Sequence, residues 1–414
     1  MKIENLPSEF IDARKVLQVI EQNGFEAYFV GGSVRDTLLN LPIHDVDMAT
    51  SAYPAEIKKI FKRTIDTGIE HGTVTVMFDH KGFEITTFRT ESGYQDFRRP
   101  DKVTFIRSLK EDLKRRDFTI NAFAMKENGE VIDLFNGMED LQHHLIRAVG
   151  DANQRFNEDA LRMMRAVRFG SQLNFKIEEK TFAAIKANCQ LLKKIAIERI
   201  NVEFIKMMLG ISPSRGLQEI LGTDLFEYVP FFNQYLSELK HLANLDLSNH
   251  LTNEIQVWSL LAFELNLKQS QIRKMMKLWK CSNKMTENVL QVVKGIKMLQ
   301  NKQIVSLFIY QIGLNNLLNA NHVMEIYGLN QGEEELENAF NSLPIKQKAE
   351  LNVNGGSLIK AGFKPGPQLG KVLNDLELMV INGEVENDQI TLINKAKELA
   401  NENWGSYGRN FTSR

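Results

Sequence analysis

The sequence predicts an α+β fold, in which a head with a small mixed sheet is followed by an all-helical remainder. Short runs rich in β-branched and aromatic residues occur within residues 1–140. Beyond residue 140, apolar residues recur at helical spacing and strand signals nearly vanish. The chain of 414 residues is too long for one ordinary core, so we expect roughly two to four structural units.

The head mixes several strand-like runs with helices. Gly, Asp or His residues bound the strand-like runs, as is typical of strands that end in turns. One short helix is predicted behind a turn. The predicted strands are Ala27–Val30, Val74–Phe78, Phe83–Phe88 and Val131–Phe135, and the predicted helix is Pro54–Lys62.

The remainder of the chain shows the apolar spacing of helices. It has no clear fixed-period repeat and no low-complexity tract. A Gly/Pro cluster at Gly362–Gly370 interrupts its last third. The clearest predicted helices are Asn157–Leu173, Glu179–Leu192, Ile197–Leu209, Trp258–Leu265 and Gln271–Lys280.

The composition narrows the class of protein. Hydrophobic residues make up 43% and charged residues 25%, values typical of a soluble folded protein. No apolar run approaches the roughly 20 residues that span a bilayer, and the first ten residues lack the apolar stretch of a signal peptide. We therefore expect a cytoplasmic protein with no membrane partner. Cys189 and Cys281 lie far apart, which argues against a disulfide framework or a Cys-rich zinc site.

The net charge of −1 neither indicates nor excludes a nucleic-acid partner. Binding to nucleic acid requires local positive patches, and a positive total is not necessary.

Two aspartates, Asp45 and Asp47, form the first candidate site. If their segment is a strand, both carboxylates point to the same face of the sheet. Paired carboxylates suit Mg²⁺, which takes carboxylate, phosphate and water oxygens. Taken alone, a D-x-D pair is more often a surface turn or a helix cap.

A glycine pair just upstream strengthens this interpretation. Gly31 and Gly32 follow a predicted strand and precede a plausible helix at Val34–Leu39. Glycines allow the backbone to approach a phosphate closely, and the start of a helix favours anions. Arg35 can then reach a triphosphate oxygen, and Asp36 can orient it. The alternative is a glycine turn with a surface arginine.

Two further stretches carry closely spaced arginines. Arg115–Ala122 reads RRDFTINA, and Glu158–Arg168 reads EDALRMMRAVR. In the second stretch the charged residues recur every three positions, so on a helix they form a drifting row on one side. The alternative for both stretches is a charged solvent face. The recurring residues are Asp159, Arg162, Arg165 and Arg168.

These motifs together resemble those of the class II CCA-adding enzymes and the related bacterial poly(A) polymerases. The residues that carry the resemblance are GG-x-VRD-x-LL followed by D-x-D, RRDFTINA, and the E-D-x-x-R of Glu158–Arg162. The resemblance implies a polymerase-β-like nucleotidyltransferase head at residues 1–140. It also implies a helical neck with the nucleotide-selecting helix at 141–209, a helical body at 210–325 and a helical, tRNA-binding tail at 326–414.

The implied activity is template-independent addition of C, C and A to the 3′ end of tRNA. CTP and ATP would be the substrates and pyrophosphate would be released in a two-metal mechanism. The resemblance makes Asp45 and Asp47 catalytic, as ligands of Mg²⁺. The implied nucleotide-binding residues are Gly32, Arg35, Arg116, Asp159, Arg162, Arg165 and Arg168.

Base selection follows from the chemistry of one implied pair. Asp159 can only accept hydrogen bonds and Arg162 can only donate them. Cytosine and adenine both present an amino donor beside a ring-nitrogen acceptor, whereas guanine and uracil present the reverse order. A wrong base leaves buried polar groups unpaired, at about 1–3 kcal/mol each.

Several implied roles concern neighbouring segments. Thr87–Asp101 resembles the flexible element that the family needs to switch from C to A addition, and its presence favours full CCA activity. Asp133–Leu141 resembles a hinge, and Glu198 and Arg199 resemble braces of the selecting helix. In the second half of the chain, lysines and arginines could form a surface for the tRNA backbone or simply a charged helical surface.

A third acidic residue and the exact reaction are both left open by the sequence. Glu84 is the candidate for the third acid, with Asp117 as its competitor. A poly(A) polymerase or A-adding enzyme would use the same scaffold and the same aspartate pair. A different class of protein is a tRNA-binding module without activity. The sequence does not distinguish a monomer from a homodimer.

Overall fold

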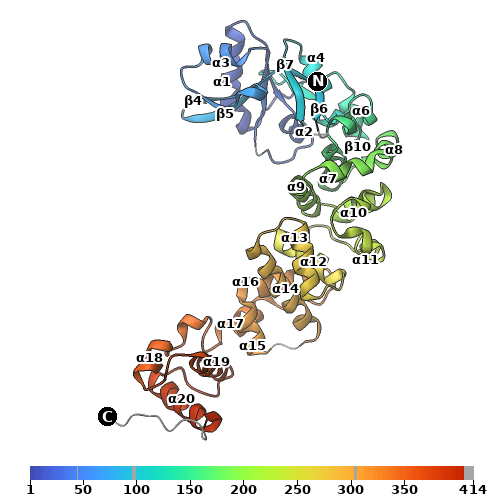
Figure 1. The fold of residues 1–414 in the computed structure, drawn as a ribbon. Helices are drawn as coiled ribbons and strands as arrows, with labels where there is room; N and C mark the ends of the chain where they lie inside the picture. Colours follow the sequence, from blue (N-terminus) through green and yellow to red (C-terminus); the bar gives the residue numbers. More distant parts are fainter. Residues whose placement is uncertain (44, 96–98, 303–304, 405–414) are drawn as a thin grey trace. The chain divides into compact units, whose positions relative to one another are not determined.

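The structure is a computed structural model that describes residues 1–43, 45–95, 99–302 and 305–404 (Figure 1). It divides into two compact units, which we describe separately. The first comprises residues 1–249 with 278–280, and the second comprises residues 250–277 with the chain from Cys281 onward. The predicted four-part division is finer than this one and stays a prediction.

The head is built on a seven-stranded mixed sheet in the order β3-β4-β5-β2-β1-β8-β9. The central strands β2 and β5 run parallel, and the other neighbouring pairs are antiparallel. This confirms the predicted mixed sheet. The strands are β1 Ala27–Val30, β2 Met48–Thr50, β3 Thr64–Gly68, β4 Thr73–Phe78, β5 Lys81–Thr87, β8 Phe123–Met125 and β9 Val131–Asp133.

Two helices of the head have apolar faces that pack into its core. α1 (Ser8–Gln22) buries five apolar residues at helical spacing, and its Phe10 ring meets the Phe29 ring of β1 edge-on at 4.7 Å. α3 (Pro54–Ile60) is the helix predicted at this position, and it begins with Pro54 as expected. The sequence patterns did not identify α1.

The segment that resembles a flexible element contains a two-stranded antiparallel ribbon. Its strands are β6 (Arg89–Gln95) and β7 (Arg99–Phe105), and residues 96–98 lie outside the described residues. At its base, the backbone N–H of Arg89 donates to the buried carboxylate of Asp112 on α4 (Leu109–Lys114). The ribbon is therefore attached to the helix that leads into the RRDFTINA segment.

The rest of the first unit is almost entirely helical, as predicted (Figure 1). A two-residue parallel pair, β10 (Leu145–Ile146) with β11 (Lys176–Ile177), is the exception among its described residues. The helices are α5 Gly137–Gln142, α6 Ala152–Glu158, α7 Leu161–Leu173, α8 Glu179–Asn188, α9 Ile197–Met208, α10 Pro213–Gly222 and α11 Leu236–Leu242.

The helix predicted at Asn157–Leu173 is wrong at one point. α6 ends at Glu158, and Asp159 adopts an extended conformation with φ −138° and ψ 104°. The carboxylate of Asp159 accepts a hydrogen bond from the backbone N–H of Leu161, where α7 begins. An Asp side chain that bonds to a nearby N–H competes with helix continuation, and apolar periodicity does not report this competition.

In its described residues, the second unit contains helices and turns and no strand. The helices are α12 Glu254–Glu264, α13 Gln269–Leu278, α14 Asn283–Gln300, α15 Ser306–Ile312, α16 Leu314–Glu325, α17 Glu333–Asn341, α18 Gly355–Lys360, α19 Pro367–Ile381 and α20 Gln389–Trp404. α13 ends within the three-residue segment that groups with the first unit. A membrane-crossing helix, which would need greater length and apolarity, is absent from the described parts of both units.

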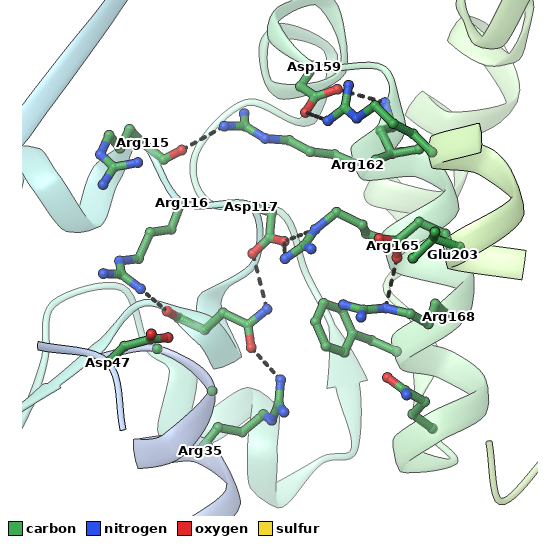
Figure 2. A pocket seen from close by; sticks show the side chains of 18 of the residues that line it. Arg35, Asp47, Arg115, Arg116, Asp117, Asp159, Arg162, Arg165, Arg168 and Glu203 are labelled. Atoms are coloured by element: carbon green, nitrogen blue, oxygen red, sulfur yellow. Dashed lines mark hydrogen bonds and ion pairs between the residues drawn. The ribbon is translucent and has the colours of Figure 1, made fainter. Parts of the chain in front are cut away.

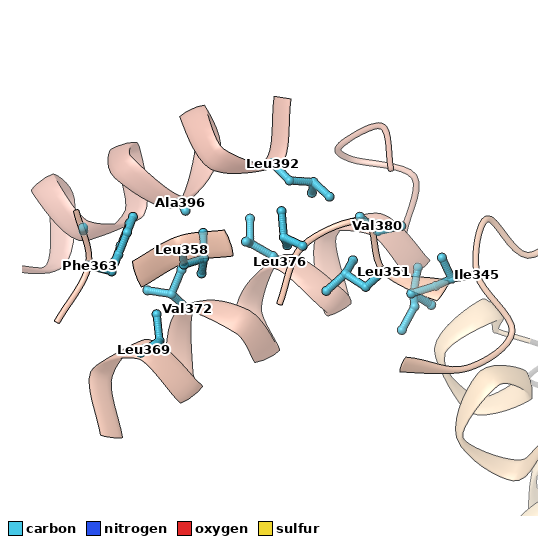
Figure 3. Close-up of a cluster of buried hydrophobic side chains, with 13 residues drawn as sticks. Ile345, Leu351, Leu358, Phe363, Leu369, Val372, Leu376, Val380, Leu392 and Ala396 are labelled. Atoms are coloured by element: carbon cyan, nitrogen blue, oxygen red, sulfur yellow. The ribbon is translucent and has the colours of Figure 1, made fainter. Parts of the chain in front are cut away.

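The last helices of the chain enclose their own apolar core (Figure 3). Leu376 and Val380 on α19 face Leu392 and Ala396 on α20, and Leu358 of α18 lies in the same cluster. All five of these side chains are fully buried. Burial of an apolar side chain of Leu or Val size stabilises a fold by about 1.5–3 kcal/mol, so this cluster holds the tail together.

A partly buried glutamate makes the stability of the first unit depend on pH. Glu219 on α10 lies behind α7, near Gly170. Burial raises the pKa of Glu219 to about 7, although a backbone N–H at Ile177 and the charge of Arg215 oppose the rise. The unfolded chain releases this proton near the ordinary pKa of 4.5. The contribution of Glu219 to stability is therefore present below pH 4.5 and is lost as the pH rises through 7.

We predict that Glu219→Gln stabilises the protein at pH 8 by about 2 kcal/mol, because the variant need not bury a charge. The gain should shrink towards zero near pH 5. Denaturant unfolding at both pH values measures it, with the exposed Glu337→Gln as a pH-independent control. An equal gain at both pH values would contradict the assignment.

Candidate active site

A cavity of about 910 Å³ opens inside the first unit, between the head sheet and the helices that follow it (Figure 2). The glycine pair, the RRDFTINA segment, α7 and α9 form its walls. Seven arginines and five acidic residues line it, so positive charge is in excess. These residues are Arg35, Arg115, Arg116, Arg162, Arg165, Arg168 and Arg199, with Asp47, Asp117, Asp159, Glu198 and Glu203.

The glycine pair forms the floor of this cavity. Gly31 has φ +76°, a conformation that L side chains rarely adopt, and α2 (Gly32–Leu38) begins at the next residue. A Cβ at position 31 would lie 2.9 Å from Nη1 of Arg116 and 3.7 Å from Oδ2 of Asp47. Glycine at this position therefore lets the guanidinium and the carboxylate approach the backbone. The predicted helix is confirmed, and it starts two residues earlier than expected.

The aspartate pair lies in the segment that leads into β2. β2 begins only at Met48, so Asp45 and Asp47 precede the strand. Both side chains are exposed, and Asp47 lines the cavity whereas Asp45 does not. The β2–β5 register, Met48 opposite Ile85, brings Asp47 beside Glu84. The structure therefore places three carboxylates near one another, two just before β2 and one within β5.

The pKa of Asp47 reflects this gathering. Surrounding protein removes water from part of the carboxylate and raises its pKa, even though the side chain reaches the open cavity. The positive charge of Arg116 opposes the rise, and the negative charges of Asp45 and Glu84 add to it. A divalent cation at this position would relieve the repulsion among these acids.

The donor set fits a hard cation that brings further ligands with it. Three or more His, Cys, Asp or Glu side chains placed to hold a metal by themselves do not occur among the described residues. Asp45 and Asp47 would supply carboxylate oxygens, and water and phosphate would complete the shell. His44 lies outside the described residues.

Asp117 of the RRDFTINA segment is committed to other contacts. Burial raises its pKa, but the ion pair with Arg165 at 2.6 Å and the hydrogen bond from Asn121 outweigh this effect and hold the pKa of Asp117 well below its ordinary value. Asn121 in turn accepts a hydrogen bond from Arg35 at 2.6 Å through its side-chain oxygen. Asp117 is therefore engaged with arginines, whereas Glu84 lies beside Asp47.

The arginines that were predicted to bind the nucleotide converge from several elements (Figure 2). Arg116 lies over the glycine floor and donates to the backbone carbonyl of Asn121 at 3.4 Å. Arg35 comes from α2, and Arg165 and Arg168 come from α7. Arg168 forms an ion pair with the buried Glu203 of α9 at 2.9 Å.

The predicted base-selecting residues also line the cavity, although Asp159 precedes the helix that carries Arg162. Asp159 forms an ion pair with Arg199 of α9 at 3.0 Å. Arg162 forms an ion pair with Glu158 at 2.8 Å and donates to the carbonyl of Arg115 at 2.8 Å. Asp159 and Arg162 therefore each form an ion pair with a different residue and not with one another.

Sequence reasoning missed several residues of this site. Asn121 and Glu203 received no role, yet they hold Arg35 and Arg168. Phe169, which lies among the arginines, was also missed. Asn121 belongs to a motif that was singled out, so its polar side chain was an available signal. Glu203 closes the E-R-I-x-x-E stretch that begins with the predicted braces Glu198 and Arg199, so it was an available signal too. Phe169 carries none, because tertiary packing places it.

Comparison with known proteins identifies the class of this fold and site. Residues 27–147 match the family model described as the poly A polymerase head domain. Residues 174–236 match a probable RNA-binding site of polymerase A, and residues 249–396 match a domain of tRNA nucleotidyltransferases. The class is thus that of nucleotidyltransferases with a polymerase head.

Curated relatives and a solved structure narrow the class to one family. The CCA-adding enzyme of Pediococcus pentosaceus is 56% identical, over 95% of this chain and 99% of the relative. That of Enterococcus faecalis is 48% identical, over 96% and 98%. The crystal structure of the Bacillus stearothermophilus CCA-adding enzyme in complex with CTP is 38% identical, covers 96% of this chain and 99% of that chain, and gives a TM-score of 0.88. This chain belongs to the CCA-adding enzyme family, which confirms the resemblance.

Proposed function

We propose that this protein adds C, C and A to the 3′ end of tRNA without a nucleic-acid template, using CTP and ATP and releasing pyrophosphate. The observation that carries the proposal is that Asp159 and Arg162 line the same arginine-rich cavity as Asp47. Family membership supports the same activity. The tRNA substrate favours a cytoplasmic location.

The first task of the site is to hold a triphosphate. Arg35, Arg116, Arg165 and Arg168 lie along the cavity with donors that suit phosphate oxygens. Because Gly31 has no Cβ, the Arg116 guanidinium lies close to the backbone, and a phosphate bound by Arg116 would lie near the glycine pair. These contacts do not distinguish one base from another, since every nucleoside triphosphate carries the same phosphates.

The second task is to choose the base. The acceptor-only Asp159 and the donor-only Arg162 match the shared edge of cytosine and adenine. Arg199 holds the Asp159 carboxylate, and Glu158 with the Arg115 carbonyl holds the Arg162 guanidinium. Side chains that are held before the substrate arrives lose less freedom when it binds, so selection by two residues is effective.

The third task is phosphoryl transfer. Asp45 and Asp47 would hold Mg²⁺ together with phosphate oxygens, with Glu84 as the third acid. Mg²⁺ bound there supplies a lowered pKa for the attacking 3′-hydroxyl and charge compensation for the leaving pyrophosphate. The chain itself aligns the triphosphate through its arginines and keeps the carboxylates at the strand ends. A two-metal arrangement is consistent with the three acids.

The direct test uses tRNA that lacks its 3′ CCA, with Mg²⁺ and each nucleoside triphosphate singly and together, followed by sequencing of the products. We expect CCA to be added and the reaction then to stop. Arrest after CC would indicate a CC-adding enzyme, and an A tail of varying length would indicate a poly(A) polymerase. Retained tRNA binding with no product would indicate an inactive module.

We predict that Asp45→Ala lowers incorporation by about a thousandfold or more, because loss of a metal ligand removes several kcal/mol of transition-state stabilisation. Affinity for tRNA should stay within about twofold, since the variant leaves the arginines intact. Single-turnover incorporation and filter binding measure the two effects. Asp66→Ala, on the head sheet but outside the cavity, is the matched control. Normal turnover in Asp45→Ala would refute the metal assignment.

We predict that Asp159→Ala lowers the preference for C and A over U and G by about tenfold to a hundredfold, since it removes one of the two reading side chains. Competition between CTP and UTP in one reaction measures the preference. Asp151→Asn removes an acid from the same segment while keeping a residue that caps α6, and its preference should not change. Unaltered selectivity in Asp159→Ala would rule out the two-residue reading.

A further inference from the structure

Three arginines of the cavity lie against one aromatic ring, that of Phe169 on α7. The guanidinium carbons of Arg35, Arg165 and Arg168 are 5.0, 5.4 and 4.1 Å from the ring centroid. All three distances are within the roughly 6 Å over which a cation is attracted to a ring. We propose that Phe169 is a positioning residue that holds these three arginines in one group for the triphosphate. This inference rests on the proposed function and adds a residue to it.

The ring is itself held in place from behind. Phe169 is only 5% exposed, and its ring meets the Phe118 ring edge-on, with centroids 5.9 Å apart and planes at 83°. Phe118 is fully buried within the RRDFTINA segment. Edge-on pairs of this kind are a favourable aromatic geometry. Phe169 is therefore a fixed surface between α7 and that segment, and a cation placed on it has a defined position.

Each arginine of the group also has one carboxylate partner. Arg35 pairs with Asp36 at 2.7 Å, Arg165 with Asp117 at 2.6 Å and Arg168 with Glu203 at 2.9 Å. The three acids come from three different elements, α2, the RRDFTINA segment and α9. Asp117 also reaches Arg35 through the side chain of Asn121, but none of these three acids forms an ion pair with all three guanidinium groups. The Phe169 ring is a surface that all three share.

Bringing three positive charges together is costly without such a surface. Burial, together with the neighbouring positive charges of Arg165 and Arg35, lowers the pKa of Arg168 to about 10, against the opposing charges of Glu203 and Asp117. The repulsion must be offset while no substrate is bound. An aromatic face attracts cations through its quadrupole and carries no net charge.

This neutrality is what fits the ring to phosphate binding. A fourth carboxylate at the same place would hold the arginines equally well, but it would cancel their charge and repel the triphosphate. An aliphatic side chain would fill the volume and attract no cation. The phenyl ring groups the guanidinium ions and leaves their charge for the phosphates, so it contributes to the affinity for CTP and ATP alike.

The experiment compares Phe169→Leu and Phe169→Tyr with Phe156→Leu. Phe156 on α6 is equally buried and lies outside the cavity lining, so its variant matches the loss of core packing. Steady-state incorporation gives KM and kcat for CTP and for ATP. Calorimetry with inorganic tripolyphosphate gives the affinity for the phosphates alone and requires no catalysis. Thermal unfolding shows that each variant is folded.

We expect Phe169→Leu to raise KM for CTP and ATP by the same factor, about fivefold to twentyfold, with kcat reduced by no more than about threefold. Its affinity for tripolyphosphate should fall by a similar factor, and its preference for C over U should not change. Phe169→Tyr should stay within about twofold of the unmodified protein, and Phe156→Leu should keep its KM.

Three results would overturn the proposal. These are an unchanged tripolyphosphate affinity in Phe169→Leu, an equal loss of affinity in Phe156→Leu, and a Phe169→Tyr variant as weak as Phe169→Leu. If the unmodified protein binds tripolyphosphate but incorporates no nucleotide, the proposed function fails, and the calorimetry still decides the role of Phe169.

Discussion

The ion pair between the buried Asp117 and the partly exposed Arg165 is the contact on which the rest of the site depends. It joins the RRDFTINA segment of the head to α7, the helix that also carries Arg162 and Arg168. The same carboxylate receives the amide of Asn121, and the oxygen of that amide receives Arg35. One acid thus orders arginines on both sides of the cavity. Removal of Arg165 would leave the buried carboxylate of Asp117 without its ion-pair partner, which is costly.

This arrangement explains why a cavity that binds an anion contains so many acids. Seven arginines without partners would repel one another and would be costly to bury. Asp117, Asp159 and Glu203 each accept one of them, and the pairs point the guanidinium groups into the cavity (Figure 2). The acids therefore lower the cost of the empty site and leave a net positive charge for the substrate.

Sequence reasoning reached the fold class and most of the cavity lining, because both depend on local signals. Strand-like runs, helical spacing and the arginine motifs are readable one segment at a time. Asp45 and Asp47 were expected on a strand, whereas β2 begins after them. Asp159 was expected on a helix. Instead it is extended, and its carboxylate accepts a hydrogen bond from the backbone N–H of Leu161. In both cases the residues next to the end of a strand or helix do not adopt the secondary structure that the neighbouring sequence predicts.

The residues that sequence reasoning missed share a different origin. Glu203 holds Arg168 because α9 packs beside α7. Asn121 holds Arg35 because α2 places Arg35 next to it. Such pairings join positions 35 to 86 residues apart, so no spacing rule reports them. Membership of a motif identifies which residues meet the substrate. The packing of the helices determines which residues hold those in place.

The separation of the two sets of contacts accounts for the use of two different nucleotides by one cavity. In the proposed function, the arginines grouped around Phe169 bind the phosphates, which CTP and ATP have in common. Asp159 and Arg162 are proposed to bind the base edge, and their partners Arg199 and Glu158 lie on different helices, α9 and α6. Each of the two side chains is therefore held independently of the other. A pyrimidine and a purine need different amounts of room at the same edge, and two independently held side chains provide it while the phosphate contacts stay the same.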